Sequence, residues 1–124
     1  MPFYYDGDDA DVTWGVTVSL RNISVPAGHD VTIHCSSEHD TYWNFVGTNA
    51  TKNSTGPRLI CYRGLSIPVN RQKYRCPKTS AGQWPVVIRN FGQSDVGQYT
   101  CWDTRNPHDR DTALLSLACK YARN

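Results

Sequence analysis

The chain has 124 residues, of which 39% are hydrophobic and 19% are charged, and its formal net charge is +2. This length suits one domain of ordinary size. No apolar run reaches the roughly 18 residues that a membrane-spanning helix needs, and so small a charge does not indicate nucleic-acid binding. The first residues lack the apolar stretch of a signal peptide. We therefore expect any membrane contact to run through segments absent from this chain.

Short strands separated by turn residues make up most of the chain, and no helical period persists for three turns. Turn residues dominate 25–30, while 47–57 and 105–112 have the composition of exposed loops. Such a series of strands without helices favours an all-β sandwich over an α/β fold. The predicted strands, in chain order, are 14–20, 31–35, 41–46, 58–62, 72–76, 84–91, 98–104 and 112–121.

The cysteines indicate an oxidising compartment. Five are present, and none forms the CxxC pair that is typical of zinc sites, which favours disulfides. Three glycosylation sequons begin at Asn22, Asn49 and Asn53, and they point to the same secreted or cell-surface location. The odd cysteine implies either a free thiol or a bond outside the chain.

The most specific feature is the D-x-G-x-Y-x-C sequence at 95–101. In immunoglobulin sandwiches, a tyrosine two residues before the second core cysteine folds its hydroxyl back onto the chain. Tyr99 and Cys101 have this spacing, and Cys35 ends a plausible earlier strand. Trp43 then stands where such sandwiches carry their core tryptophan. These residues predict a variable-type immunoglobulin-like two-sheet sandwich.

The disulfide pairing does not follow from the cysteine positions alone. Five choices of the unpaired cysteine, with three connectivities each, remain open. The immunoglobulin template selects Cys35–Cys101, whose loop of 66 residues is worth about 4 kcal/mol in the chain-entropy model. A second bond, Cys61–Cys76, would staple a sheet edge; alternatively, one of these two pairs with Cys119, which is otherwise unassigned.

A longer series of residues carries a family resemblance. It runs Cys35, Trp43, Leu59-Ile-Cys61, Tyr74-Arg-Cys76, Val86-Val-Ile-Arg-Asn90 and Asp95-x-Gly-x-Tyr99. This order resembles the immunoglobulin-like domain of a cytomegalovirus membrane-glycoprotein family, to which a conserved repeat of adenovirus early-region proteins is related. The resemblance covers residues 31–101. It implies a viral immunomodulatory glycoprotein that binds a host immune cell-surface protein or the Fc part of IgG. The expected location is secreted, or the extracellular part of a type I membrane protein on infected cells or virions.

Two other functions remain open from the residues. A host immune receptor or adhesion domain would share the fold. A structural subunit of an envelope complex could use Cys119 as its intermolecular link. The sequence shows no nucleophile elbow, no paired-carboxylate cleft and no clustered metal ligands. We therefore expect no enzymatic activity, cofactor, metal or small-molecule substrate.

Trp102 is the first candidate for contact with a partner. It follows Cys101 directly, so strand alternation turns it outward if Cys101 faces the core. Tryptophan is enriched at interface hot spots. The alternative is that a neighbouring side chain or loop covers it. The predicted loop 105–112 adds Arg105, His108 and Arg110, either as recognition residues or as solvated side chains.

Charge is distributed unevenly along the chain. Residues 1–11 carry four aspartates and no base, and we expect them to form a flexible acidic segment ahead of one domain at 12–124. Segment 58–78, which includes Arg63 and Arg71, carries six basic residues and no acid. This segment either steers an acidic partner or is a solvated edge with an internal pair such as Arg71 with Asp95.

Overall fold

The computed structural model describes residues 15–48, 58–68, 71–77, 79 and 81–118. These residues form short β-strands and the 3-10 helix η3, which confirms the all-β prediction. The elements are β2 (Thr17–Val18), β3 (Asn22–Val25), β4 (Val31–Ile33), β5 (Cys35–Ser36), β6 (Thr41–Gly47), β7 (Arg58–Tyr62), β8 (Leu65–Ser66), β9 (Tyr74–Arg75), β10 (Val86–Ile88), η3 (Gln93–Asp95), β11 (Gly97–Asp103) and β12 (Asn106–Leu117).

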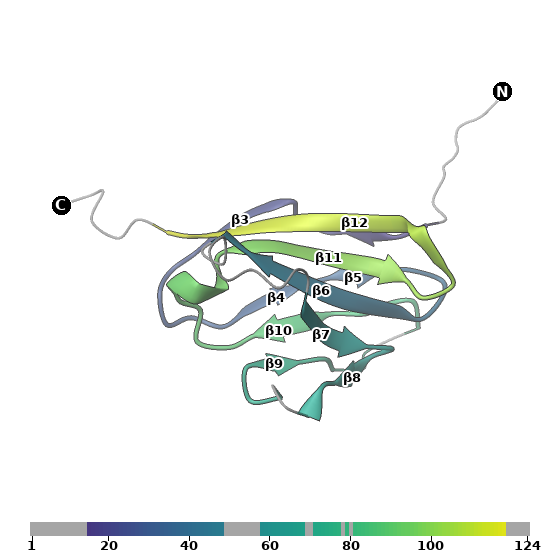
Figure 1. Cartoon of the computed structure of the whole chain (residues 1–124), viewed down its shortest axis with the longest axis horizontal. Helices are drawn as coiled ribbons and strands as arrows, with labels where there is room; N and C mark the ends of the chain where they lie inside the picture. Colours follow the sequence, from purple (N-terminus) through teal and green to yellow (C-terminus); the bar gives the residue numbers. More distant parts are fainter. Residues whose placement is uncertain (1–14, 49–57, 69–70, 78, 80, 119–124) are drawn as a thin grey trace, which may run out of the picture.

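The strands form one large sheet and two small ones. The large sheet has six strands in the order β3-β12-β11-β6-β7-β8, and the others have the orders β4-β10-β9 and β2-β5. All pairs are antiparallel except β3 with β12, which is parallel. In Figure 1, β12, β11 and β6 of the large sheet lie in front of β4, β5 and β10.

The hydrophobic core comes from alternate residues of the strands. Trp43 and Phe45 of β6 are buried, as are Tyr99 and Cys101 of β11. Thr41 and Asp103 are buried on the same side. The residues between these inward positions point the other way, because successive side chains of a strand face opposite sides of its sheet. From the predicted strand 84–91, Val86, Ile88 and Phe91 are buried in the same core.

The corner before β11 is built as the motif predicts. The Tyr99 hydroxyl donates a 2.6 Å hydrogen bond to the Asp95 carbonyl. Burial, with the nearby Tyr74 and Asp95, raises the pKa of Tyr99 far above its ordinary value, so the donor stays protonated. Gly97 is required here because a Cβ would lie 2.8 Å from the Gly47 Cα atom.

Both expected disulfides are present. Cys35–Cys101 joins β5 to β11, and Cys61–Cys76 joins β7 to the residue after β9. Cys61 and Cys76 are 1% and 7% exposed, so this bond lies in the core between two sheets rather than stapling an outer edge. Cys119 lies outside the described residues.

Several predicted strands are shorter in the structure: segments 14–20, 72–76 and 84–91 contain only β2, β9 and β10. Two other predicted segments differ by more than their bounds. Segment 31–35 divides at His34, because β4 pairs with β10 whereas β5 pairs with β2. The loop predicted at 105–112 is wrong: a turn at 104–105 leads directly into β12. The polar side chains at 106–110 remain exposed or half-exposed while their strand pairs with β11, so strand formation does not bury them.

Candidate interaction face

A row of large side chains crosses the outer face of the six-stranded sheet. Its members are cross-strand neighbours, each paired in register with the next. They lie in five consecutive strands, which span about 19 Å at ~4.8 Å per strand. We call this set the outer row; it consists of Leu65, Tyr62, Tyr42, Trp102 and Arg110.

The aromatic rings of the outer row form a nearly continuous platform. The Tyr42 and Trp102 rings are stacked, with centroids 5.8 Å apart and planes inclined by 2°. Tyr62 continues the platform, its ring centroid 6.3 Å from that of Tyr42 at a tilt of 42°. Tyr62 and Leu65 are 44% and 62% exposed, so the β7–β8 end of the row presents apolar surface to solvent.

Trp102 points outward, as alternation predicts, and is partly covered. The Arg110 guanidinium carbon lies 4.7 Å from the Trp102 ring centroid, in a cation–π contact. With its amide turned to satisfy both neighbours, Asn44 accepts a 3.2 Å hydrogen bond from Trp102 Nε1 and donates to the Trp43 carbonyl. The indole is therefore held in place by its neighbours on the same face.

Arg63 flanks the other end of the row. Its guanidinium carbon lies 5.9 Å from the Tyr62 ring centroid, and its Nε donates a 2.9 Å hydrogen bond to Asp40 Oδ2. The bond to Asp40 and the charge of that carboxylate raise the pKa of Arg63. Arg63 is thus neutralised locally, whereas no carboxylate among the described residues is paired with Arg110.

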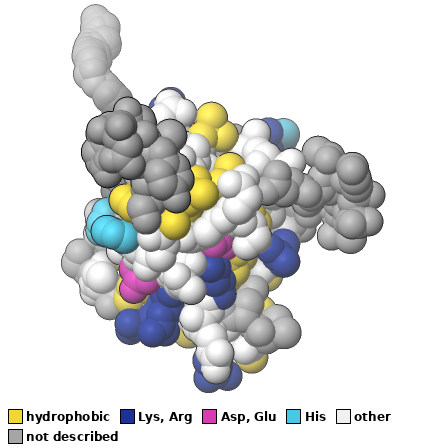
Figure 2. Space-filling view, turned by 90° about the vertical axis from the view of Figure 1, so that its left-hand side faces the viewer, with side chains coloured by type: hydrophobic (Ala, Val, Ile, Leu, Met, Phe, Trp, Pro, Cys, Tyr) yellow, Lys and Arg dark blue, Asp and Glu magenta, His cyan; other side chains and the backbone are white. Residues whose placement is uncertain are grey.

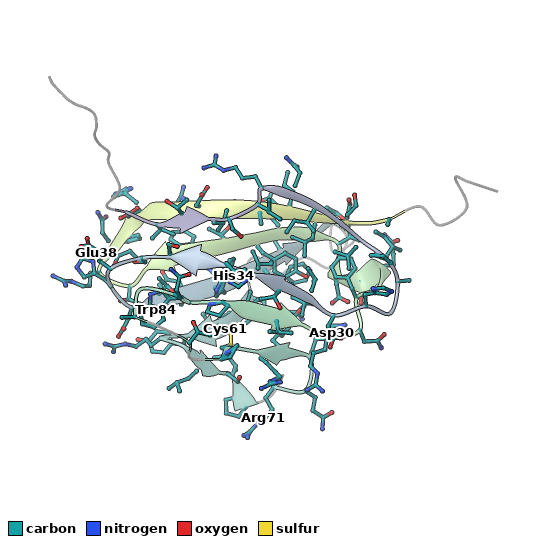
Figure 3. All side chains as sticks on the ribbon, turned by 180° about the vertical axis from the view of Figure 1, so that it is seen from behind. Asp30, His34, Glu38, Cys61, Arg71 and Trp84 are labelled. Atoms are coloured by element: carbon teal, nitrogen blue, oxygen red, sulfur yellow. A yellow bond between two sulfur atoms is a disulfide. The ribbon has the colours of Figure 1, made fainter. Side chains whose placement is uncertain are left out.

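The other predicted contact residues lie away from the row. Arg105 occupies the β11–β12 turn, and His108 is exposed, with its backbone N–H bonded to Asn106 Oδ1. Figure 2 shows Lys and Arg side chains gathered mostly in the lower half of the end with η3. Figure 3 shows Arg71 at the lower edge, beyond β9. The pair suggested between Arg71 and Asp95 is not formed: Lys73 Nζ takes that place, 2.7 Å from Asp95 Oδ2.

A hollow of about 330 Å³ lies at the β11–β12 turn, lined in part by His39, Asp103 and Arg105. His39 Nδ1 is 3.1 Å from Asp103 Oδ2, and the Arg105 backbone N–H donates to Asp103 Oδ1. Burial favours the neutral acid, but these two hydrogen bonds outweigh it and lower the pKa of Asp103. The pair joins residues 64 positions apart, and no sequence pattern indicated it.

The sequons are only partly within the described structure. Asn22 is exposed at the start of β3, an edge strand of the large sheet. Its register partner, Leu114, lies four residues along β12 from Arg110, about 13 Å at strand spacing. A glycan on Asn22 would therefore begin well away from the outer row. Asn49 and Asn53 lie outside the described residues.

The described residues contain neither a membrane-spanning helix nor a cluster of metal ligands. No helix there is long and apolar enough to cross a bilayer. In that same part of the chain, no three His, Cys, Asp or Glu side chains gather where they could hold a metal ion.

Comparison with known proteins identifies no relative of this chain among family models or curated sequences. No protein-family model matches the chain, and no curated protein sequence matches it. The two disulfides indicate an oxidising, extracellular or secreted environment.

Proposed function

We propose that this chain is a variable-type immunoglobulin-like recognition domain. Several features support this fold: an inter-sheet disulfide, a buried tryptophan beside it and the tyrosine hydroxyl bonded four residues back. The facing sheets are joined through a buried core, as in a sandwich. In such a domain the outer face of the larger sheet is free to bind a partner.

The partner we propose is a protein, and the outer row carries the proposal. Exposed large apolar side chains gathered on one face, among them Tyr62 and Leu65, are typical of interaction sites. Tyrosine, tryptophan and arginine are the residues that most often dominate binding energy, and the row contains all three. The family resemblance directs the choice of partner: a host immune cell-surface protein or IgG Fc, bound by a viral immunomodulatory glycoprotein.

A binding screen with matched variants tests this function. The glycosylated protein is screened against human immune-cell ectodomains and IgG Fc, and each hit is measured again with Trp102→Ala and Tyr62→Ala. We expect Trp102→Ala to weaken binding about thirtyfold, since hot-spot residues contribute about 2 kcal/mol or more. His34→Ala is the control, because His34 is exposed on the opposite side of the molecule.

The same measurements can contradict the proposal. Circular dichroism and thermal unfolding establish that each variant is folded. If folded Trp102→Ala and Tyr62→Ala proteins bind every hit as the unchanged protein does, the outer row is not the binding surface. A screen of both partner classes without a hit would contradict the proposed immune target.

A further inference from the structure

Five carboxylates of the described residues lie on the strands and turns around the outer row, and four of them already accept hydrogen bonds from the protein itself. Asp40 accepts from Arg63, and the buried Asp103 accepts from His39 and the Arg105 backbone. Among the described residues no donor is bonded to the Glu38 carboxylate, and Glu38 lines the hollow at the β11–β12 turn rather than the row. The two remaining acids take backbone donors: Asp109 accepts from the Val16 N–H, and Asp111 from the Val18 N–H and Arg21.

The arginines of this end differ from one another: Arg63 and Arg21 are paired with Asp40 and Asp111, whereas two others form no ion pair within the described residues. Arg110 is exposed, and within the described ranges its guanidinium contacts the Trp102 ring rather than a carboxylate. Arg105, in the adjoining turn, also forms no ion pair there. A guanidinium stacked on a ring keeps its N–H donors in its own plane, directed away from the ring and available to an acceptor.

We propose that the outer row recognises an acidic segment of a protein partner, with a carboxylate of that segment on Arg110. An apolar or aromatic side chain of the same segment packs beside it, on Tyr42, Tyr62 and Leu65. This inference rests on the proposed function and adds the chemistry of the partner. A bidentate guanidinium–carboxylate pair supplies direction, and the aromatic platform supplies buried area.

The shape of the row favours a protein over an acidic sugar. The row is about 19 Å long, which matches an extended segment of about six residues better than a single sugar ring. The hollow lined by Asp103 lies next to the row rather than within it. None of the outer-row residues lines this hollow, so the proposed segment lies along the row and outside the hollow.

The test uses peptides selected without prior choice of partner. A library of random peptides of about twelve residues, long enough to cross the row, is selected on the complete glycosylated protein. Enriched peptides are then measured by calorimetry with the unchanged protein, Arg110→Gln, Tyr42→Ala and Arg75→Gln. Arg75→Gln is the matched control, because Arg75 is exposed on β9 of the opposite sheet.

We expect the enriched peptides to combine Asp or Glu with an aromatic residue. Arg110→Gln should weaken them at least about tenfold, as for a hydrogen-bonded charge pair that loses one partner. Raising the salt from about 0.05 M to 0.3 M should weaken binding to the unchanged protein more than to Arg110→Gln. Arg75→Gln should bind as the unchanged protein does.

Other outcomes separate the two proposals. Peptides without acidic residues that lose binding in Tyr42→Ala but not in Arg110→Gln overturn this inference and leave the proposed function standing. Peptides indifferent to both variants, or a library without binders, count against both. Sialyllactose, tested as a second probe, would overturn the protein assignment if it bound and Arg110→Gln abolished that binding.

Discussion

The two faces of β6 and β11 both carry aromatic residues, which are buried on the inner face and partly exposed on the outer face. Trp43 is 1% exposed, and its Nε1 donates a 2.8 Å hydrogen bond to the Trp84 carbonyl. Trp102, on the neighbouring strand, faces outward and bonds to an amide on its own face. Because strand alternation separates the two faces, a change on the outer face leaves the core packing intact. We therefore expect changes that affect the proposed recognition to be separable from changes that affect stability, although both faces belong to the same two strands.

Replacing each tryptophan in turn gives the largest contrast between the faces. Trp43→Ala should lower the free energy of unfolding by about 3–5 kcal/mol, because it opens a cavity in a packed core. Trp102→Ala should lower it by less than about 1 kcal/mol, since a half-exposed site away from the core leaves no such cavity. Urea unfolding followed by circular dichroism measures both. Equal losses would show that the outer row also supports the fold.

Removing each disulfide in turn tests how much it contributes to the stability of the core. Replacing Cys35 and Cys101 together with alanine should cost about 4 kcal/mol, and replacing Cys61 and Cys76 about 3 kcal/mol, from the lengths of the loops they close. Thermal unfolding of the two double variants gives the comparison. A larger loss for the 61–76 pair would mean that packing of the buried sulfurs outweighs the loop-closure effect.

The corner before β11 should show a smaller effect. Tyr99→Phe removes the hydroxyl that bonds to the Asp95 carbonyl while keeping the ring in the core. Leaving a buried acceptor unpaired costs about 1–3 kcal/mol. Urea unfolding measures the loss, and Tyr42→Phe is the matched control on the outer face. If both variants lost the same amount, the corner bond would have no special role.

The acid sensitivity of the fold should depend on Asp103. Its pKa is lower in the folded chain than in the unfolded chain, so the stability it contributes is present above the ordinary aspartate range. That contribution is lost as the pH falls through the folded value. Asp103→Asn should therefore flatten the decline in stability between about pH 4 and pH 2. Thermal midpoints measured across this range check it, and an unchanged slope would contradict the assignment.

Much of the core could be predicted because its signals are local. The spacing of Tyr99 and Cys101 predicted the corner, and the template that it suggested predicted the Cys35–Cys101 disulfide. Cys61–Cys76 lay outside that template and was predicted with Cys119 as an alternative partner. β3 was missed because Asn22–Val25 is short and half polar. It forms a strand only because β12 lies alongside it.

The outer row was predicted only at its Trp102 and Arg110 end. Tyr42 and Tyr62 join Trp102 through the register of three strands, which depends on the assembled sheet rather than on any short pattern. The Lys73–Asp95 pair was missed for the same reason. Arg71 and Lys73 are both basic and lie in one segment, and only the fold shows which of them contacts Asp95.

The register around Trp43 has a consequence for spectroscopy. On one side its strand partner is Cys101, and on the other it is Cys61, so a disulfide cysteine flanks Trp43 on each neighbouring strand. Disulfides accept electrons from an excited indole and quench its emission. The fluorescence of Trp43 should thus be dim in the native chain and brighten on reduction, which provides a label-free optical readout of the oxidation state of the core.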